Sequence, residues 1–248
     1  MEFSDQAIIL RLGLFREADI WVRLFSPGRG VFSAFAFGGG RSRRRFSGCL
    51  DLFNEVLFQI RRSRHGDYLD LREGALLHGP ERLRRDWRRL GMARNCAYFM
   101  EALPLGGEDA AGAHALFVDL LNNLETREDL PQRLPLFFRA RMIFAQGYAF
   151  DPDHCAVCGR TWGEESAVFP PGVSGPLCLS CARPALSGGI LLRPEALVML
   201  RRICKASLES WDMRDIPEWA QQSCARALEA FWQSHAGLRW DHGRFRNA

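Results

Sequence analysis

Four cysteines beyond the middle of the chain have the spacing of a metal site. Cys155 and Cys158 are separated by two residues, as are Cys178 and Cys181, and nineteen residues lie between the pairs. Two intervening residues let a tight turn aim both thiolates at one point, and two such turns complete a tetrahedron around zinc. Four thiolates leave no coordination position open for water or substrate. The sequence therefore predicts one structural zinc ion, held by a zinc-binding segment at 155–185.

Other interpretations of these cysteines are weaker. A single C-x-x-C motif can be a redox pair, and four unrelated free thiols are a further alternative, but two pairs in one short segment favour a metal. His154 precedes the first pair and could replace a ligand, although four cysteines already complete the site. Residues 168–169 and 172–177 predict a small hairpin between the pairs. The remaining cysteines stand singly in largely apolar surroundings and are predicted to be core residues: Cys49, Cys96, Cys204 and Cys224.

A cluster of arginines after a triple glycine could bind nucleic acid. Residues 38–46 read Gly-Gly-Gly-Arg-Ser-Arg-Arg-Arg-Phe. Guanidinium groups hold phosphates bidentately and release counterions from DNA, and an aromatic ring can stack on an unpaired base. We expect the glycines to be flexible and to allow close approach of the backbone. A solvated, charge-rich loop is the alternative. The predicted DNA-binding residues of this segment are Arg41, Arg43, Arg44, Arg45 and Phe46.

A second group of arginines lies where a helical pattern begins. If residues 81–90 form one helix, three arginines share a face, and Arg84 and Arg88 lie beside it. We predict that this face also contacts DNA, with a solvated helix face as the alternative. Lys205 is the only lysine in the chain, so codon usage could explain the choice of arginine. It does not explain the clustering. The three residues predicted to share the face are Arg82, Arg85 and Arg89.

The secondary structure that must position these residues is predicted to change from strands to helices near residue 80. Five strand-like segments precede it and are too few for a sandwich of two sheets, so they favour a small closed barrel of the OB type. They are Ala7–Leu12, Asp19–Phe25, Val31–Phe37, Leu50–Ile60 and Tyr68–Ala75.

After Gly79-Pro80 apolar residues recur at helical spacing. Leu83, Trp87, Leu90, Ala97 and Met100 predict a buried stripe on one helix, and later helices can open at Pro135, Pro194 and Pro217. The predicted fold class is therefore α+β multidomain. It has an OB-fold β-barrel at 1–80, followed by an α-helical domain at 81–154 and 186–248, which the four-cysteine zinc ribbon interrupts.

Composition and missing motifs exclude several classes of protein. The 248 residues carry a net charge of only +4, and the acidic start MEFSD lacks the basic-then-apolar layout of a secretory signal. Apolar runs are too short to cross a bilayer, so we expect a cytoplasmic protein without membrane partners. The chain has no Walker glycine loop, H-E-x-x-H or G-x-S-x-G motif. We therefore expect neither an enzyme nor a small-molecule substrate.

Several segments, taken in order along the chain, are similar to the bacterial RecO family of recombination mediators. They are Ala7–Leu10, Phe15–Asp19, Leu24–Gly30, Gly38–Phe46 with Gly48–Leu50, Gly147-Tyr148 with Pro152 and Cys155–Gly159, Gly237–Arg239, and Arg244-Phe245. The tail after Trp240 departs from the family by being less apolar.

This resemblance implies an N-terminal OB-fold, a helical domain and an inserted zinc ribbon. It also implies binding of single- and double-stranded DNA, annealing of complementary strands and association with the nucleoid when engaged. With the partner RecR, such proteins load the RecA recombinase onto DNA coated by single-strand-binding protein. The acidic C-terminal tail of that protein would need an apolar groove with a cationic rim. The alternative function is a zinc-ribbon protein–protein adaptor without annealing activity.

Overall fold

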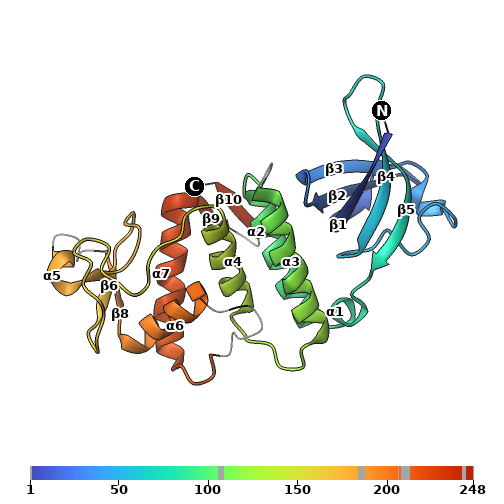
Figure 1. Cartoon of the computed structure of the whole chain (residues 1–248). Helices are drawn as coiled ribbons and strands as arrows, with labels where there is room; N and C mark the ends of the chain where they lie inside the picture. The colour runs from blue at the N-terminus through green and yellow to red at the C-terminus, as the bar shows by residue number, and fades with distance from the viewer. Residues whose placement is uncertain are drawn as a thin grey trace. The chain divides into compact units, whose positions relative to one another are not determined.

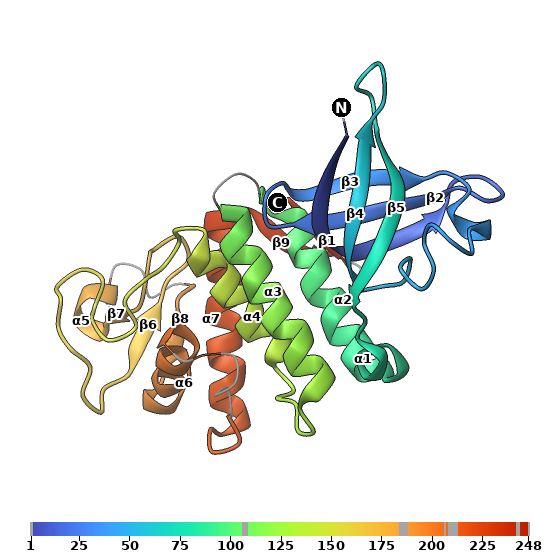
Figure 2. The same cartoon turned by 45° about the vertical axis from the view of Figure 1, so that its right-hand side comes forward.

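The computed structural model describes residues 2–105, 109–183, 188–205, 207, 213–241 and 244–247. The chain divides into two compact units. The first consists of residues 1–97 and 104–127, and the second of residues 98–103 and 128–248. Figures 1 and 2 show a barrel of strands at the blue end of the chain and helices with a small sheet toward the red end.

Five strands of the first unit form a closed barrel in the order β1-β2-β3-β5-β4. The barrel closes because β1 pairs antiparallel with both β2 and β4, while β3 and β5 run parallel. This OB-like barrel confirms the predicted fold class. Its strands are β1 (Glu2–Leu14), β2 (Ile20–Ser26), β3 (Gly30–Ala36), β4 (Glu55–Arg62) and β5 (Leu69–His78).

Alternation along the strands separates the barrel core from its outer face. On β3 the small residues Ala34 and Ala36 point inward and are fully buried, while Phe35 and Phe37 around them are only partly buried. The interior of a five-stranded barrel is narrow, so small side chains on one strand make room for Phe58 of β4. The ring of Phe35 therefore lies on the outer face of β3, whereas Phe32 is partly buried against the core.

The connection from β3 to β4 closes one end of the barrel. It begins with a short 3-10 turn, η1 (Gly39–Arg41), and continues to β4 at Glu55. Residues 50–54, which were expected to start the fourth strand, form bends and turns instead. That expectation was wrong because Phe53 has a positive φ of 61°, a conformation that a strand cannot contain.

Three helices follow the barrel: α1 (Glu81–Arg85), α2 (Trp87–Ala102) and α3 (Asp109–Thr126). The predicted change from strand to helix near residue 80 is confirmed. However, the predicted single helix across 81–90 is broken, because Asp86 is extended with φ −101° and ψ 112°. Trp87 consequently does not join the buried stripe but is 80% exposed. Phe117 of α3 packs edge-to-face against Phe25 of the barrel.

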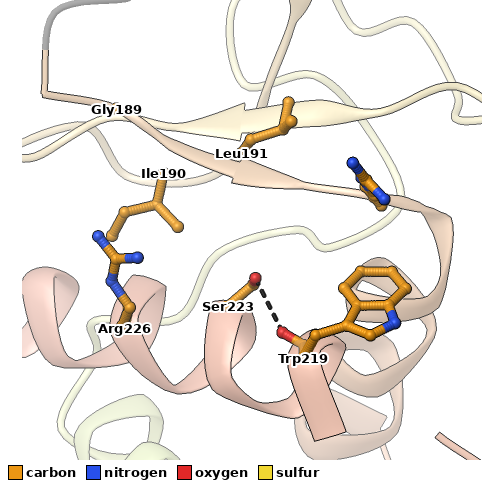
Figure 3. A pocket seen from close by; sticks show the side chains of 7 residues that line it. Gly189, Ile190, Leu191, Trp219, Ser223 and Arg226 are labelled. Carbon is orange, nitrogen blue, oxygen red and sulfur yellow. Dashed lines mark hydrogen bonds between the residues drawn. The ribbon is translucent and has the colours of Figure 1, made fainter. Parts of the chain in front are cut away.

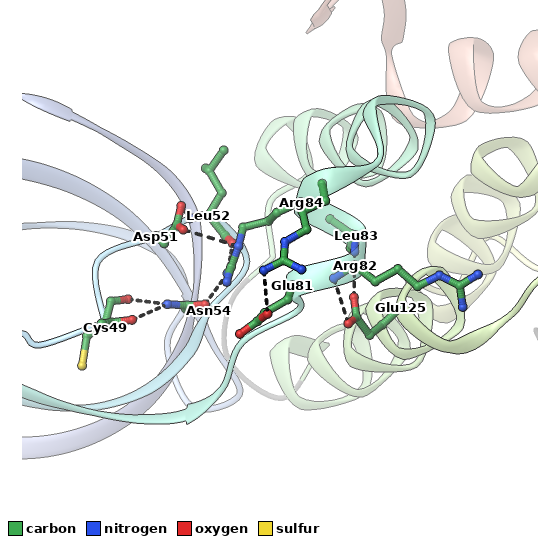
Figure 4. A network of polar contacts seen from close by, with 11 residues as sticks. Cys49, Asp51, Leu52, Asn54, Glu81, Arg82, Leu83, Arg84 and Glu125 are labelled. Atoms are coloured by element: carbon green, nitrogen blue, oxygen red, sulfur yellow. Dashed lines mark hydrogen bonds and ion pairs between the residues drawn. The ribbon is translucent and has the colours of Figure 1, made fainter.

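A buried polar network joins α1 to the end of the barrel (Figure 4). Asn54 is fully buried, and its Nδ2 donates to the carbonyl oxygens of Gly48 and Cys49, each at 2.9 Å. Arg84 of α1 donates to Asn54 Oδ1 and, at 3.1 Å, to the carbonyl of Leu52. Buried polar groups need such partners, so the network fixes where the helix begins relative to the strands.

Replacing Asn54 by alanine is expected to destabilise the first unit by about 3 kcal/mol, because two buried carbonyls and one guanidinium N–H lose their partner. Urea unfolding followed by circular dichroism measures this change. Gln59→Ala is the matched control, since Gln59 bonds to Ser4 on the exposed surface of the same barrel and should change stability by no more than about 0.5 kcal/mol. Equal stabilities of the two variants would contradict the assigned role.

The second unit packs helices against a three-stranded sheet of order β7-β6-β8. Prolines open its helices as predicted: Pro135 lies in the first turn of α4, Pro194 begins α6 and Pro217 caps α7. The elements are α4 (Leu134–Ala145), β6 (Ala167–Phe169), β7 (Leu177–Cys178), α5 (Leu179–Ala182), β8 (Ile190–Leu192), α6 (Pro194–Lys205) and α7 (Glu218–Ala236). The predicted boundary between residues 185 and 186 lies outside the described residues.

The structure of the C-terminal residues differs from the expectation of a helix. Residues 186–248 were expected to be helical, but the chain ends in two antiparallel strands, β9 (Leu238–Asp241) and β10 (Arg244–Asn247). Gly237 ends α7 with a positive φ of 61°, a conformation that glycine adopts readily. Leu238 and Phe245 are buried, so packing retains this pair of strands.

Among the described residues, we find no helix with the length and apolar character that a membrane span requires.

Candidate metal centre and nucleic-acid interface

The four predicted cysteine ligands come together in the second unit. The sulfur atoms of Cys155, Cys158, Cys178 and Cys181 all lie within 4.8 Å of one another. The Sγ atoms of Cys158 and Cys178 are 3.8 Å apart, about the separation that a tetrahedron with 2.3 Å zinc–sulfur bonds requires. His154 is not part of the cluster, since its Nδ1 contacts Asp151 at 2.6 Å. These residues could hold a metal ion.

Local backbone geometry explains how the two cysteine pairs converge. After Cys155 the chain turns so that the N–H of Gly159 donates to the Cys155 carbonyl at 3.0 Å, with Gly159 at φ +69°. Strands β6 and β7 form the predicted hairpin and deliver Cys178 opposite Ala167. Cys181 follows on α5. Two turns separated by a hairpin therefore place four sulfurs around one point.

The pKa values of the thiols indicate whether the protein alone can keep all four sulfur atoms ionised. Burial raises the pKa of the Cys155 thiol, but amide N–H groups of Cys158, Cys178 and Val157 outweigh it and lower the pKa to about 6. The pKa of Cys181 is instead raised to about 12 by hydrogen bonds with the sulfur atoms of Cys178 and Cys158. Protein donors alone do not keep all four sulfurs ionised. A bound divalent cation would do so, and the donor set therefore fits a thiolate-binding metal.

Aromatic packing attaches the cysteine segment to α7. The rings of Phe150 and Phe169 lie 5.0 and 6.0 Å from Phe231 of α7, and 5.4 Å from each other. Asp153, just before the first ligand, pairs with Arg201 of α6 at 3.0 Å. The segment thus has little core of its own, and its contacts to helices extend from the residues flanking the metal cluster.

The triple glycine serves packing within the protein and is not a flexible approach to DNA, which corrects the expectation. The N–H of Gly38 donates to Asp19 Oδ1 at 2.8 Å, and that of Gly40 donates to the carbonyl of Ala18 at 2.9 Å. A Cβ atom on Gly39 would lie 2.9 Å from the Cβ of Ala36, so only glycine fits there. The connection between β1 and β2 and the side chain of Ala36 on β3 therefore hold these glycines in place.

Two residues predicted to contact DNA in this loop are engaged within the protein instead. Phe46 is 4% exposed and belongs to the barrel core, so the expectation that it stacks on a base is corrected. It fills the end of the barrel, where a large apolar ring is needed. The guanidinium of Arg45 donates to the carbonyl of Phe37 at 2.6 Å and of Arg72 at 3.4 Å. Arg45 therefore anchors the loop to its surroundings.

The other three arginines of the loop are exposed. Arg41 pairs loosely with Glu17 at 3.5 Å. Arg43 and Arg44 make no ion pair or hydrogen bond within the residues that the structure describes. Since the loop backbone is held rigidly, these two guanidinium groups are presented to solvent from a fixed support. They are the loop residues whose charge is available to a phosphate.

Aromatic side chains that the sequence analysis did not assign to a site lie next to this loop. Phe15, Phe35, Phe37 and Tyr68 form an aromatic cluster with ring separations of 4.9 to 6.0 Å. Phe15 is 51% exposed and Tyr68 43%. The signal was present on β3, where phenylalanine alternates with alanine: small residues inside a narrow barrel imply that the rings face outward. The carbonyl of Phe37 accepts the Arg45 bond, which connects the cluster to the loop.

The second group of arginines does not share one face. Arg89 is 5% exposed and its guanidinium donates to the carbonyl of Leu124 and to Asp86, so it supports the end of α3. Arg82 is exposed and donates to the carbonyl of Thr126 at 3.3 Å. Arg85 is exposed and pairs with Glu81 at 3.2 Å. The predicted common face is therefore wrong, because Asp86 interrupts the helix between these residues.

A groove in the second unit lies between β8 and α7 (Figure 3). It has a volume of about 420 Å³. Ile190 points between the strand and the helix, with Arg226 at one end and Trp219 at the other. The guanidinium of Arg193 lies over the Trp219 ring, 5.3 Å from its centroid. None of the described residues that line the groove is acidic, and Arg226 makes no ion pair with any described residue.

A barrel of the OB type with an exposed basic loop, together with four cysteines placed to hold a metal ion, defines the class of OB-fold proteins with a cysteine cluster. Comparison with known families agrees. The N-terminal family model of recombination protein O matches residues 1–79, and its C-terminal model matches residues 84–244. The chain therefore belongs to the RecO family of DNA repair proteins, which supports a role as a recombination mediator.

Individual relatives match over nearly their full length. The chain is 46% identical to the DNA repair protein RecO of Oleidesulfovibrio alaskensis over 248 residues, which cover 99% of both chains. It is 37% identical to that of Lawsonia intracellularis over 249 residues, again covering 99% of both. A more distant relative from an Anaeromyxobacter species is 30% identical, with 96% of this chain and 93% of the relative covered.

Proposed function

We propose that the protein binds single- and double-stranded DNA through the first unit, anneals complementary strands, and with the partner RecR promotes loading of RecA onto DNA coated by single-strand-binding protein. The observation that carries the DNA-binding part is that Arg43 and Arg44, which have no acidic partner among the described residues, lie on the loop that Arg45 bonds to the aromatic cluster. Cations hold the phosphates of an unpaired strand, and rings stack on its bases. Membership of the RecO family supports the remaining steps.

The proposed annealing mechanism involves no bond-making. Two DNA strands repel one another through their phosphates, and a cationic surface that holds one strand lowers the repulsion felt by the second. Bases held on aromatic rings remain able to pair when a complementary strand arrives. The protein thus raises the frequency of productive encounters.

A strand-annealing assay with two fluorescently labelled complementary oligonucleotides tests this proposal. The protein is expected to accelerate annealing at moderate salt, and added RecR should modulate the rate on DNA coated by single-strand-binding protein. An adaptor that only bridges proteins would bind DNA weakly at physiological salt and leave the annealing rate unchanged. That result would refute the proposed function.

The proposed resident metal is one zinc ion held by Cys155, Cys158, Cys178 and Cys181. When bound, zinc would stabilise four thiolates in a closed tetrahedral site. The protein's own contribution is to bring the sulfurs together and to exclude a fifth ligand. The site then stabilises the scaffold and takes no part in contacting DNA.

For the single-strand-binding protein, the proposed contact is its acidic C-terminal tail in the groove between β8 and α7. Two arginines and the Trp219 ring line the groove beside Ile190, and none of the described lining residues is acidic, so an acidic peptide with an apolar side chain complements it. Strand β8 is also an edge strand of its sheet. An extended peptide can hydrogen-bond to such an edge.

Arg226→Glu is expected to weaken binding of a labelled tail peptide by at least about tenfold, because an attractive charge at the rim becomes repulsive. Fluorescence anisotropy measures the affinity. Arg160→Glu, an equal charge change in the same unit but outside the groove, is the control and should bind the peptide like the wild type. Unaltered binding by the Arg226 variant would exclude this groove.

A further inference from the structure

An exposed tryptophan stands among arginines where α1 meets α2. Trp87 is the first residue of α2 and is 80% exposed. Its ring makes no aromatic or cation–π contact with the described residues. Leaving so large an apolar surface in water is unfavourable. We define the α1–α2 corner as Arg85, Asp86, Trp87, Arg88, Gly91 and Arg94, all of which belong to the first unit.

The shape of α2 leaves the indole accessible. Residues 87, 91 and 94 share one helix face, because they are four and three positions apart. Gly91 is exposed, and a Cβ placed on it would meet nothing within 4 Å. Glycine within a helix costs about 1 kcal/mol relative to alanine. Here the missing side chain leaves the helix surface open at Gly91, about one turn after Trp87.

The acidic groups near the corner are already used by the protein. Asp86 Oδ1 accepts the N–H of Arg88 at 2.8 Å and of Arg89 at 3.3 Å, thereby capping α2, and the Arg88 amide lowers the pKa of this carboxyl. Glu125 accepts the N–H groups of Arg82 and Leu83 at the start of α1. Arg88 has no acidic partner among the described residues. The corner therefore presents a net positive charge around an apolar ring.

We infer that the α1–α2 corner is a second stacking site for unpaired bases, in which Trp87 stacks on a base and Arg88 binds an adjacent phosphate. The combination of a planar apolar surface and positive charge fits a nucleotide, which is planar, apolar on its faces and anionic. This inference rests on the proposed function and extends it beyond the barrel. It also supplies the aromatic contact that Phe46 cannot provide.

The test compares binding of oligothymidylate with binding of an abasic oligonucleotide of equal length and charge. Trp87→Ala should bind oligothymidylate about tenfold more weakly than the wild type, because one base–aromatic stack is lost. Its affinity for the abasic oligonucleotide should be unchanged, and so should its salt dependence. Trp87→Phe should recover most of the affinity. Arg88→Gln should instead reduce the salt slope, by about 0.7.

Because the indole is exposed, these variants should fold like the wild type, which thermal unfolding verifies. Tyr148→Ala removes an exposed aromatic residue from the second unit and serves as the control. If the wild type binds DNA and Trp87→Ala binds both oligonucleotides with the same affinity, the inference is overturned while the proposed function stands. The stacking site is likewise overturned if the variant loses affinity for a protein partner alone. A wild type that binds no DNA would overturn both.

Discussion

Replacing Cys158 by serine is expected to reduce the metal content of the purified protein from about one zinc per chain to near none, because three thiolates no longer complete a closed tetrahedral site. The protein should also become less stable. A structural zinc ion contributes about 10 kcal/mol or more of apparent binding energy, and the cysteine segment has few other means of holding its fold. Elemental analysis and thermal unfolding measure the two effects.

The structure also indicates which residues should unfold locally when Cys158→Ser loses its metal. Loss of the metal should expose the segment around β6 and β7 and loosen the contacts of Phe150 and Phe169 with Phe231, so limited proteolysis is expected to cleave within residues 155–183. Cys204→Ser is the matched control. Cys204 lies outside the cluster, and burial raises the pKa of its thiol to about 12, so it should not influence metal content. Binding of DNA by the first unit should survive in Cys158→Ser. Loss of DNA binding in a correctly folded variant would contradict the separation of roles.

The double replacement of Arg43 and Arg44 by alanine is expected to lower the log–log salt slope for single-stranded DNA by about 1.4, since each lost phosphate contact contributes about 0.7. If the variant and the wild type converge at 1 M salt, this corresponds to about 25-fold weaker binding at 0.1 M. Fluorescence anisotropy over a salt series measures both quantities. Annealing should slow in parallel.

Two further variants separate charge from structure in this experiment. Arg160→Ala combined with Arg183→Ala removes the same charge from exposed positions of the second unit, and its slope should stay within error of the wild type. Arg45→Ala should instead lower stability, because the carbonyls of Phe37 and Arg72 lose a donor. An unchanged slope for the Arg43 and Arg44 double variant would remove the loop from the interface.

Properties that depend on neighbours in the sequence were predictable from it. The two C-x-x-C pairs identified the candidate metal ligands because two intervening residues set the geometry of each turn locally. Five strand-like segments and the change of period near residue 80 indicated a barrel followed by helices, and prolines marked the starts of α4, α6 and α7. The order of similar segments indicated the RecO family, which the comparisons confirmed.

The roles of individual side chains depended on residues distant in sequence. Arg45 and Arg89 cannot be told from their exposed neighbours in the sequence. Arg45 nevertheless bonds to the carbonyls of Phe37 and Arg72, and Arg89 bonds to the carbonyl of Leu124 near the end of α3. Neither charge is therefore fully available to DNA. Phe46 enters a core built from strands spread over residues 7–71, whereas Phe35 and Phe37 remain outside because that core is narrow. One extended residue, Asp86, turned Trp87 from a predicted core position to solvent.

The candidate metal ligands, the change from a barrel to helices and the family could thus be read from the chain alone, because short-range geometry and similarity along the chain carry that information. Which arginines and aromatic residues face solvent became apparent only in the folded protein. Exposure is set by what packs against a side chain, and such a partner can be remote in sequence: Leu124, which accepts the Arg89 bond, lies 35 residues away. The four cysteines are proposed to support the scaffold, and the proposed DNA-binding surface is formed by the folded barrel and the corner that follows it.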